Sequence, residues 1–163
     1  MSLDGKIARS DGSFDWLMPY PPQEFGIEAF ESSIDAVVMG RATYEIECSR
    51  PDWPHAGKPT FVVTSRPLAN PPPLVEARPA DFLALAREIE QRGYRKVGVE
   101  GGGLLIRGLV AVDKLDVLEM ALIPLVLGDG IALFPSGTPE LKLHLMKCET
   151  KSSGALHLVY ERG

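Results

Sequence analysis

One carboxylate in this chain stands directly beside a run of three glycines. Glu100 follows the apolar residues 97–99, and the glycines at 101–103 lead into a helical pattern that begins with Leu104. Because glycine has no Cβ, such a turn can adopt positive φ and let a ligand approach the backbone closely. The N-terminus of the following helix adds unpaired N–H groups and a positive dipole end, which favour a phosphate. The segment therefore indicates a nucleotide-type cofactor site, with a plain strand-to-helix turn as the alternative.

A second turn of this kind follows the apolar residues 36–39. Gly40 ends that run, and Arg41 and Thr43 fall in the first turn of the next helical pattern. A guanidinium, a hydroxyl and a helix N-terminus together make a cradle for phosphate. An ordinary helix start, with Thr43 as the cap and Arg41 in solvent, is the alternative.

A third polar turn consists of Thr64, Ser65 and Arg66 and follows the apolar residues 61–63. Two hydroxyls and a guanidinium suit a ribose 2′-phosphate, whereas an acidic residue would favour the free 2′-hydroxyl. The sequence therefore predicts NADP(H) rather than NAD(H) as the cofactor. All three turns come at the carboxyl ends of expected strands, which is where open α/β sheets bind their ligands.

The elements that must position these turns alternate between strand and helix in the first two thirds of the chain. Helical spacing of apolar residues marks segments near 22–33, 82–89 and 104–110. The last third changes to alternating strand patterns near 115–123, 141–145 and 156–160. Crossovers through helices favour parallel strands, and consecutive strands favour antiparallel pairs. We therefore expect an α/β fold with a mixed, mostly parallel central sheet flanked by helices and antiparallel strands at the C-terminal end.

Composition and charge bound the class of protein. With 163 residues, 45% of them hydrophobic and 24% charged, the sequence predicts one globular domain. The net charge of −5 and the lack of a basic run argue against a nucleic-acid partner. No apolar run is long enough to span a membrane, and no signal-peptide pattern opens the chain. Cys48 and Cys148 form no disulfide framework and the histidines lack metal-ligand spacing, so we expect a cytoplasmic protein without a metal site.

Longer motifs make the resemblance to one family specific. They occur in that family's order and read SLDGKIA (2–8), DAVVMGRATYE (35–45), GKPTFVVTSR (57–66), EGGG (100–103) and IPLVLGDGIALF (123–134). By these motifs the chain resembles the family that joins dihydrofolate reductases to the reductase domain of bacterial riboflavin biosynthesis. The resemblance implies one dihydrofolate-reductase-like domain over residues 1–163 that binds NADPH in an extended form.

The resemblance also implies roles for individual residues. Asp4 and Glu100 would flank the nicotinamide, and Trp16, Leu127 and Gly128 would lie near the substrate. The residues expected at the cofactor are Gly40, Arg41, Thr43, Thr64, Ser65, Arg66, Gly101, Gly102, Gly103, Leu104 and Leu105.

The catalytic hypothesis concerns two carboxyls. We expect Asp4 or Glu100 to orient the substrate and assist its protonation, because burial beside an apolar pocket raises the pKa of a carboxyl toward neutrality. The alternatives are structural: an Asp-Gly turn for Asp4 and a carboxylate bonded to turn amides for Glu100. Dihydrofolate reductases also place a carboxylate on a helix, and here Glu24, Glu28 and Glu31 are candidates that no motif distinguishes.

These expectations combine into one functional hypothesis. The sequence predicts an NADPH-dependent reductase that transfers a hydride to a small pterin-like or pyrimidine-like heterocycle. A non-catalytic ligand-binding protein that retains the reductase fold is the alternative. The family resemblance favours a homodimer. The family's first strand lies upstream of Ser2, so we expect either a clipped strand or a recorded chain that starts late.

Overall fold

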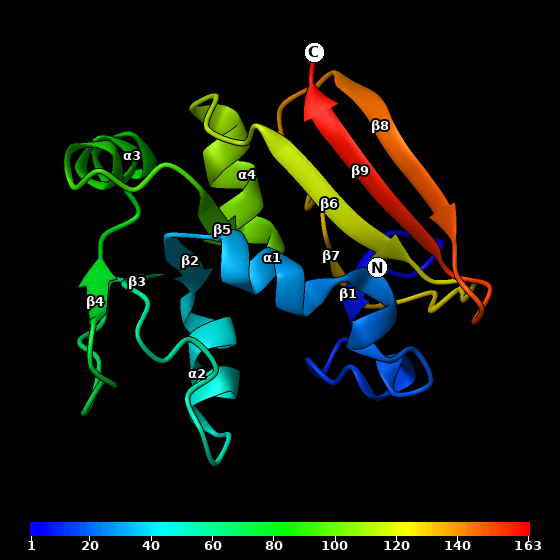
Figure 1. Cartoon of the computed structure of the whole chain (residues 1–163), viewed down its shortest axis with the longest axis horizontal. Coiled ribbons are helices and arrows are strands. Elements are labelled where there is room, and N and C mark those ends of the chain that lie inside the picture. The colour runs from blue at the N-terminus through cyan, green and yellow to red at the C-terminus, as the bar shows by residue number, and fades with distance from the viewer.

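The computed structural model describes every residue from Met1 to Gly163. Its strands form three sheets with the helices packed around them (Figure 1). In chain order the elements are β1 (Lys6–Ala8), η1 (Asp15–Leu17), η2 (Pro22–Phe25), α1 (Ile27–Ser33), β2 (Ala36–Gly40), α2 (Arg41–Cys48), β3 (Thr60–Val63), β4 (Val75–Arg78), α3 (Phe82–Gln91), β5 (Val97–Val99), α4 (Gly103–Ala111), β6 (Val117–Leu122), β7 (Ile131–Ala132), β8 (Leu143–Thr150) and β9 (Leu156–Arg162).

The largest sheet is parallel and has the strand order β4-β3-β2-β5. Its inner strand β2 carries four successive apolar side chains, from Ala36 to Met39, and all of them are buried. Burial of both faces is expected where helices cover both sides of a parallel sheet. The strands predicted near 36–39, 61–63 and 97–99, and their parallel arrangement, are confirmed.

Alternate side chains of β2 belong to two different hydrophobic clusters. Val38 packs in one cluster with Leu85 of α3 and Leu105 of α4. Met39 packs in the other with Tyr44 of α2. Successive residues of a strand point to opposite faces, so α4 and α2 cover opposite faces of the sheet. Because α2 follows β2 and α4 follows β5, both helices nevertheless begin at the same edge.

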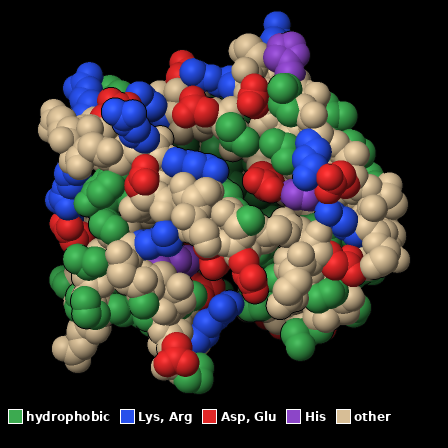
Figure 2. Space-filling view, viewed as in Figure 1, with side chains coloured by type: hydrophobic (Ala, Val, Ile, Leu, Met, Phe, Trp, Pro, Cys, Tyr) green, Lys and Arg blue, Asp and Glu red, His purple; other side chains and the backbone are tan.

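The C-terminal third forms the antiparallel sheet β6-β9-β8, as its alternating pattern predicts. Charged and histidine side chains gather over this sheet (Figure 2), where His157 Nε2 lies 2.7 Å from Glu119 Oε1. A short antiparallel ribbon of β1 and β7 brings the N-terminal segment against residues 131–132. No helix has both the length and the apolar character that crossing a bilayer demands.

Two segments differ from their expected form. The pattern over 22–33 is not one helix, because Gly26 at φ 70° separates the 3₁₀ turn η2 from α1. Left-handed backbone at glycine commonly ends a helical turn. At the N-terminus, Met1 and Ser2 run beside the end of β6: Ser2 forms an isolated parallel bridge with Ile123, whose N–H donates a 2.8 Å hydrogen bond to the Met1 carbonyl.

Candidate active site

Three polar turns meet at the carboxyl edge of the parallel sheet. Gly40 ends β2, Thr64 follows β3, and Glu100 follows β5. Because β2 pairs with both other strands in parallel, their carboxyl ends are neighbours. The N–H of Gly40 donates a 2.9 Å hydrogen bond to the carbonyl of Gly101, which ties the first turn to the glycine run. The structure therefore brings together the turns that the sequence singled out.

Two arginines border this edge. Arg41 Nη1 donates a 3.1 Å hydrogen bond to the carbonyl of Pro67, beyond the turn that follows β3. Arg41 and Arg66 both approach Glu45 Oε1, at 2.7 Å and 3.7 Å. Two guanidiniums share one carboxylate, so this corner keeps a net positive charge that suits a phosphate.

The hydroxyl-bearing residues of these turns are accessible. Ser65 is exposed, and Thr64 Oγ1 accepts a 3.1 Å hydrogen bond from the N–H of Arg66. Thr43 lies half-buried in the first turn of α2, whose N-cap is Gly40. The interpretation of Thr43 as the helix cap is therefore wrong, because no side chain caps this helix.

The glycine run divides into an open part and a packed part. Gly101 has φ 77°, and a Cβ built on Gly102 would come no closer than 3.8 Å to any atom outside its own turn. A Cβ on Gly103 would instead collide with the carbonyl oxygen of Ala132 in β7. Gly101 and Gly102 thus leave room for close approach of a ligand, whereas Gly103 lets α4 approach β7.

Leu104 and Leu105, which were both expected at the cofactor, lie in different environments. The side chain of Leu104 is 67% exposed, whereas Leu105 is 4% exposed and belongs to the main core cluster. The N–H of Leu105 also donates a 3.0 Å hydrogen bond to the carbonyl of Gly102. Both the side chain and the amide of Leu105 are therefore engaged within the fold, and Leu104 is the one that remains accessible.

Glu100 occupies a protected position on the opposite side of the sheet from α4. Its N–H donates a 3.0 Å hydrogen bond to the carbonyl of Val38, which fixes the backbone against β2. Burial, followed by the charges of Glu47 and Glu31, raises the pKa of Glu100 to about 7, while Arg50 opposes the rise. The predicted increase in pKa is confirmed for Glu100. A carboxyl that titrates near neutral pH can both give and take a proton.

The groups around Glu100 include residues that the sequence did not reveal. The charge of Arg50 affects the pKa of Glu47, of His55 and of Glu100. The charge of Glu47 affects the pKa of Glu100. His55 is 3% exposed, and burial lowers the pKa of its imidazole, which favours the neutral form. Tyr44 is the buried residue of α2, and Glu47 follows it by three residues. Residues with this spacing share one face of a helix, so the sequence held a signal that could have found Glu47. No cluster of three or more His, Cys, Asp or Glu side chains is arranged to hold a metal ion.

The structure also distinguishes the three acids near α1. Glu24 accepts hydrogen bonds from the hydroxyls of Ser152 and Ser153, at 2.7 Å and 3.0 Å, so it fastens η2 to the β8–β9 loop. Glu28 is exposed. Glu31 is half-buried, and its charge raises the pKa of Glu100. Of these three acids, Glu31 is therefore the one whose charge acts on Glu100.

Asp4 has a different environment from Glu100. Its carboxylate accepts hydrogen bonds from the N–H groups of Leu127 at 3.0 Å and Gly128 at 2.9 Å, and from the Ser2 hydroxyl at 2.7 Å. These hydrogen bonds lower the pKa of Asp4 to about 2, and the bond from the Leu127 N–H has the largest effect. The expected rise in pKa is wrong for Asp4, because hydrogen bonds to the ionised form outweigh its slight desolvation.

The residues expected near the substrate form a group around Asp4. Trp16 is 6% exposed and packs in the third hydrophobic cluster, against which Leu127 also packs. Asp4 lies two residues before β1, and Gly128 lies three residues before β7. The β1–β7 ribbon reaches the glycine run, since Ile7 and Ala132 are the neighbours of Gly102 and Gly103.

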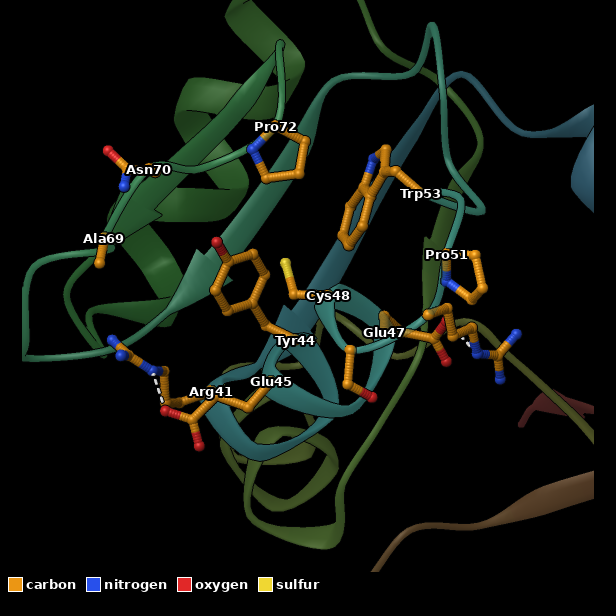
Figure 3. A pocket seen from close by; sticks show the side chains of 12 residues that line it. Arg41, Tyr44, Glu45, Glu47, Cys48, Pro51, Trp53, Ala69, Asn70 and Pro72 are labelled. Carbon is orange, nitrogen blue, oxygen red and sulfur yellow. Dashed lines mark hydrogen bonds and ion pairs between the residues drawn. The ribbon is translucent and has the colours of Figure 1, made fainter.

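A cavity of about 560 Å³ lies along α2 (Figure 3). Arg41 lines one end and Glu47 lines the other, and the rings of Tyr44 and Trp53 lie between them. Arg50 also lines the cavity and pairs with Glu47. The two ring centroids are 6.0 Å apart at an angle of 64°. The cavity therefore runs along α2 from the positive corner at Arg41 to Glu47, and Glu100 is not among its lining residues.

Comparison with known proteins identifies the family. Residues 1–157 match the model of the RibD C-terminal domain. The chain belongs to this family. The uncharacterized protein YwjB of Bacillus subtilis (strain 168) is 34% identical over 165 residues, which cover 99% of this chain and 94% of YwjB.

Solved structures with similar folds support this family assignment. A crystal structure of a Shewanella sp. PV-4 protein named for riboflavin biosynthesis is 28% identical and has a TM-score of 0.88, covering 100% of this chain and 95% of that one. Dihydrofolate reductase from Enterococcus faecalis, complexed with NADP(H), has a TM-score of 0.64 at 21% identity and covers 100% of this chain and 92% of its own. The predicted family and the dihydrofolate-reductase-like fold are confirmed.

Proposed function

We propose that this protein is an NADPH-dependent reductase of a small pterin-like or pyrimidine-like heterocycle, with Glu100 as its proton donor. The observation that carries the proposal is the position of Glu100. A half-buried carboxyl with a pKa of about 7 stands directly before the open glycines, at the edge where the arginine-bearing turns meet. Family membership and the fold shared with an NADP(H)-complexed dihydrofolate reductase support the same reading.

The residues at the sheet edge fit a phosphorylated dinucleotide. Gly101 and Gly102 carry no side chain that would fill the space beside the N-terminus of α4, and Gly40 lies against them. Arg41, Thr43, Thr64, Ser65 and Arg66 would hold the phosphates, the two arginines selecting the 2′-phosphate. When bound, the reduced nicotinamide supplies the hydride.

Glu100 would complete the reduction by supplying a proton. A C=N or C=O bond that gains hydride at its carbon leaves negative charge on the nitrogen or oxygen, which must then be protonated. The Glu100 carboxyl donates that proton and returns to its starting state by taking one from solvent. Asp4, which is ionised at neutral pH, would hold the 127–128 loop beside the substrate rather than transfer a proton.

The test combines binding with turnover. We expect calorimetry to show saturable binding of NADPH and weaker binding of NADH, and NADPH absorbance to fall when a pterin or a ribityl-aminopyrimidine is reduced. Saturable NADPH binding without oxidation by any candidate would favour the non-catalytic ligand-binding alternative. No saturable association at millimolar NADPH would rule out the reductase.

The assembly and location complete the proposal. We expect a homodimer in the cytoplasm that acts on a small-molecule substrate. Light scattering at micromolar concentration measures the first expectation, and a mass equal to the 17.7 kDa monomer would contradict it.

A further inference from the structure

Arg41 and Glu45 form an ion pair on α2 in the orientation that favours the helix least. Arg41 is the first residue of α2, and its Nε lies 2.7 Å from Oε1 of Glu45, which follows one helical turn later. A cation at the N-terminus of a helix lies at the positive end of the helix dipole, and acid–base pairs stabilise a helix better when the acid comes first. No acidic residue in the first turn of α2 offsets this charge. Helix stability therefore does not explain why an arginine occupies this position.

Glu45 also contacts a second cation, which comes from a different element. Arg66 follows β3, and its Nη2 lies 3.7 Å from the same oxygen, Glu45 Oε1. Arg41 Nη1 donates a 3.1 Å hydrogen bond to the Pro67 carbonyl, which holds α2 against this turn. Two guanidiniums from two elements thus converge on one carboxylate oxygen. Such convergence is typical of phosphate binding, where the oxygen belongs to the ligand.

The two arginines are held to different degrees. The side chain of Arg41 is 23% exposed and bonds both Glu45 and the Pro67 carbonyl. The side chain of Arg66 is 68% exposed, and its 3.7 Å contact with Glu45 is too long for a hydrogen bond. Glu45 is itself 53% exposed, and Figure 3 shows it paired with Arg41 at one end of the cavity. A phosphate that arrives from solvent can therefore replace the carboxylate at Arg66 without any movement of the core.

We propose that Glu45 is the internal counter-ion of the corner formed by Arg41 and Arg66, and that its carboxylate competes with the 2′-phosphate of NADPH for these two guanidiniums. This inference rests on the proposed binding of NADPH. In the free protein, Glu45 compensates for two neighbouring cations that repel each other. In the complex, the 2′-phosphate, with a charge of about −2, takes over this role and lies close to a like charge. Glu45 thus lowers the affinity for NADPH and has no such effect on NADH, which lacks the 2′-phosphate.

The experiment compares Glu45→Gln with the wild type by calorimetric titration of NADPH and of NADH into the full-length protein. We expect Glu45→Gln to bind NADPH about three- to tenfold more tightly, because the substitution removes a negative charge beside the phosphate. Its affinity for NADH should stay within about twofold of the wild type. Glu161→Gln is the charge-matched control, on exposed strand β9 and well apart from α2 in Figure 1, and it should bind both dinucleotides as the wild type does.

The salt dependence gives an independent readout. The gain in NADPH affinity should shrink when the ionic strength is raised to about 0.5 M, since salt screens exposed charges. A gain that persists undiminished overturns the inference, as does unchanged or weaker NADPH binding in Glu45→Gln, an equal gain for NADH, or an equal gain in Glu161→Gln.

The same titrations separate this inference from the proposed function. If neither the wild type nor Glu45→Gln shows saturable NADPH binding, the proposed function is refuted and the competition with it. If both proteins bind NADPH saturably and with the same preference over NADH, the role of Glu45 alone is refuted.

Discussion

Asp4 and Gly128 are joined by a 2.9 Å hydrogen bond from the Gly128 N–H to the Asp4 carboxylate, across more than 120 residues of sequence. The neighbouring N–H of Leu127 donates to the other carboxylate oxygen at 3.0 Å. One ionised side chain therefore fixes two consecutive amides of the loop that leads into β7. Asp4 therefore has a structural role: its two hydrogen bonds hold this loop at the border of the candidate site.

We expect Asp4→Ala to release this loop. The amide hydrogens of Leu127 and Gly128 should exchange with solvent faster by at least tenfold, because each loses its acceptor. Hydrogen exchange followed by NMR measures the effect. Asp11→Ala removes a similar exposed carboxylate that accepts from Ser13, and it should leave both amides unchanged. Unaltered exchange in Asp4→Ala would show that these two hydrogen bonds do not restrain the loop.

The second prediction concerns turnover. Glu100→Gln keeps the shape of the side chain but cannot donate a carboxyl proton. We expect the rate of NADPH oxidation to fall by about 10² to 10⁴, as for loss of a general acid, while NADPH affinity stays within about twofold. In the wild type, the same rate should fall as pH rises through about 7, because Glu100 becomes ionised. A flat profile with unchanged turnover in Glu100→Gln would remove Glu100 from the mechanism.

The third prediction concerns the pH dependence of folding stability, to which the Glu100 carboxyl contributes. The pKa of Glu100 is about 7 in the folded protein against an ordinary value of 4.5, so the folded state retains a proton that the unfolded chain has already lost between these pH values. Folding stability contributed by this group therefore decreases as pH rises from about 4.5 to 7, by on the order of 3 kcal/mol. Urea unfolding should show Glu100→Gln to be more stable than wild type at pH 8 but not at pH 5. Equal differences at both pH values would contradict the assigned burial cost.

Cofactor choice provides the fourth prediction. Arg66 is 68% exposed and reaches the shared carboxylate of Glu45 only at 3.7 Å, so its guanidinium is available to a 2′-phosphate. Arg66→Ala should weaken NADPH binding by about tenfold and leave NADH binding unchanged. Arg95→Ala, at the amino end of β5 on the opposite edge of the sheet, is the control. Equal weakening of both dinucleotides would assign Arg66 to another part of the cofactor.

The fifth prediction separates two adjacent glycines. Gly103→Ala places a Cβ against the carbonyl oxygen of Ala132, so we expect it to cost about 1–3 kcal/mol or more of folding stability. Gly102→Ala meets nothing within 3.8 Å and should fold with nearly unchanged stability, yet weaken NADPH binding where its methyl fills the cradle. Thermal melts and calorimetry measure the two effects. Loss of stability in Gly102→Ala with intact binding would reverse these assignments.

The sequence alone predicted the fold and the edge of the sheet at which the candidate site lies. The apolar runs that end at Gly40, Thr64 and Glu100 are short and continuous, as is typical of parallel strands buried on both faces. Parallel strands in one sheet bring their carboxyl ends to the same edge. The same local reasoning failed at residues 22–33, where Gly26 interrupts a helical pattern, because a single left-handed residue leaves the apolar spacing unchanged.

Only the tertiary structure decided which carboxyl has a raised pKa and which has a lowered one. Asp4 and Glu100 are equivalent as residue types, yet one accepts hydrogen bonds that lower its pKa and the other is buried among like charges that raise it. Glu31, Glu47 and Glu100 come from α1, α2 and the end of β5, so no local spacing relates them. The pKa of a carboxyl is set by solvent exclusion and by charges within a few ångströms, and the chain acquires both only when distant segments pack together.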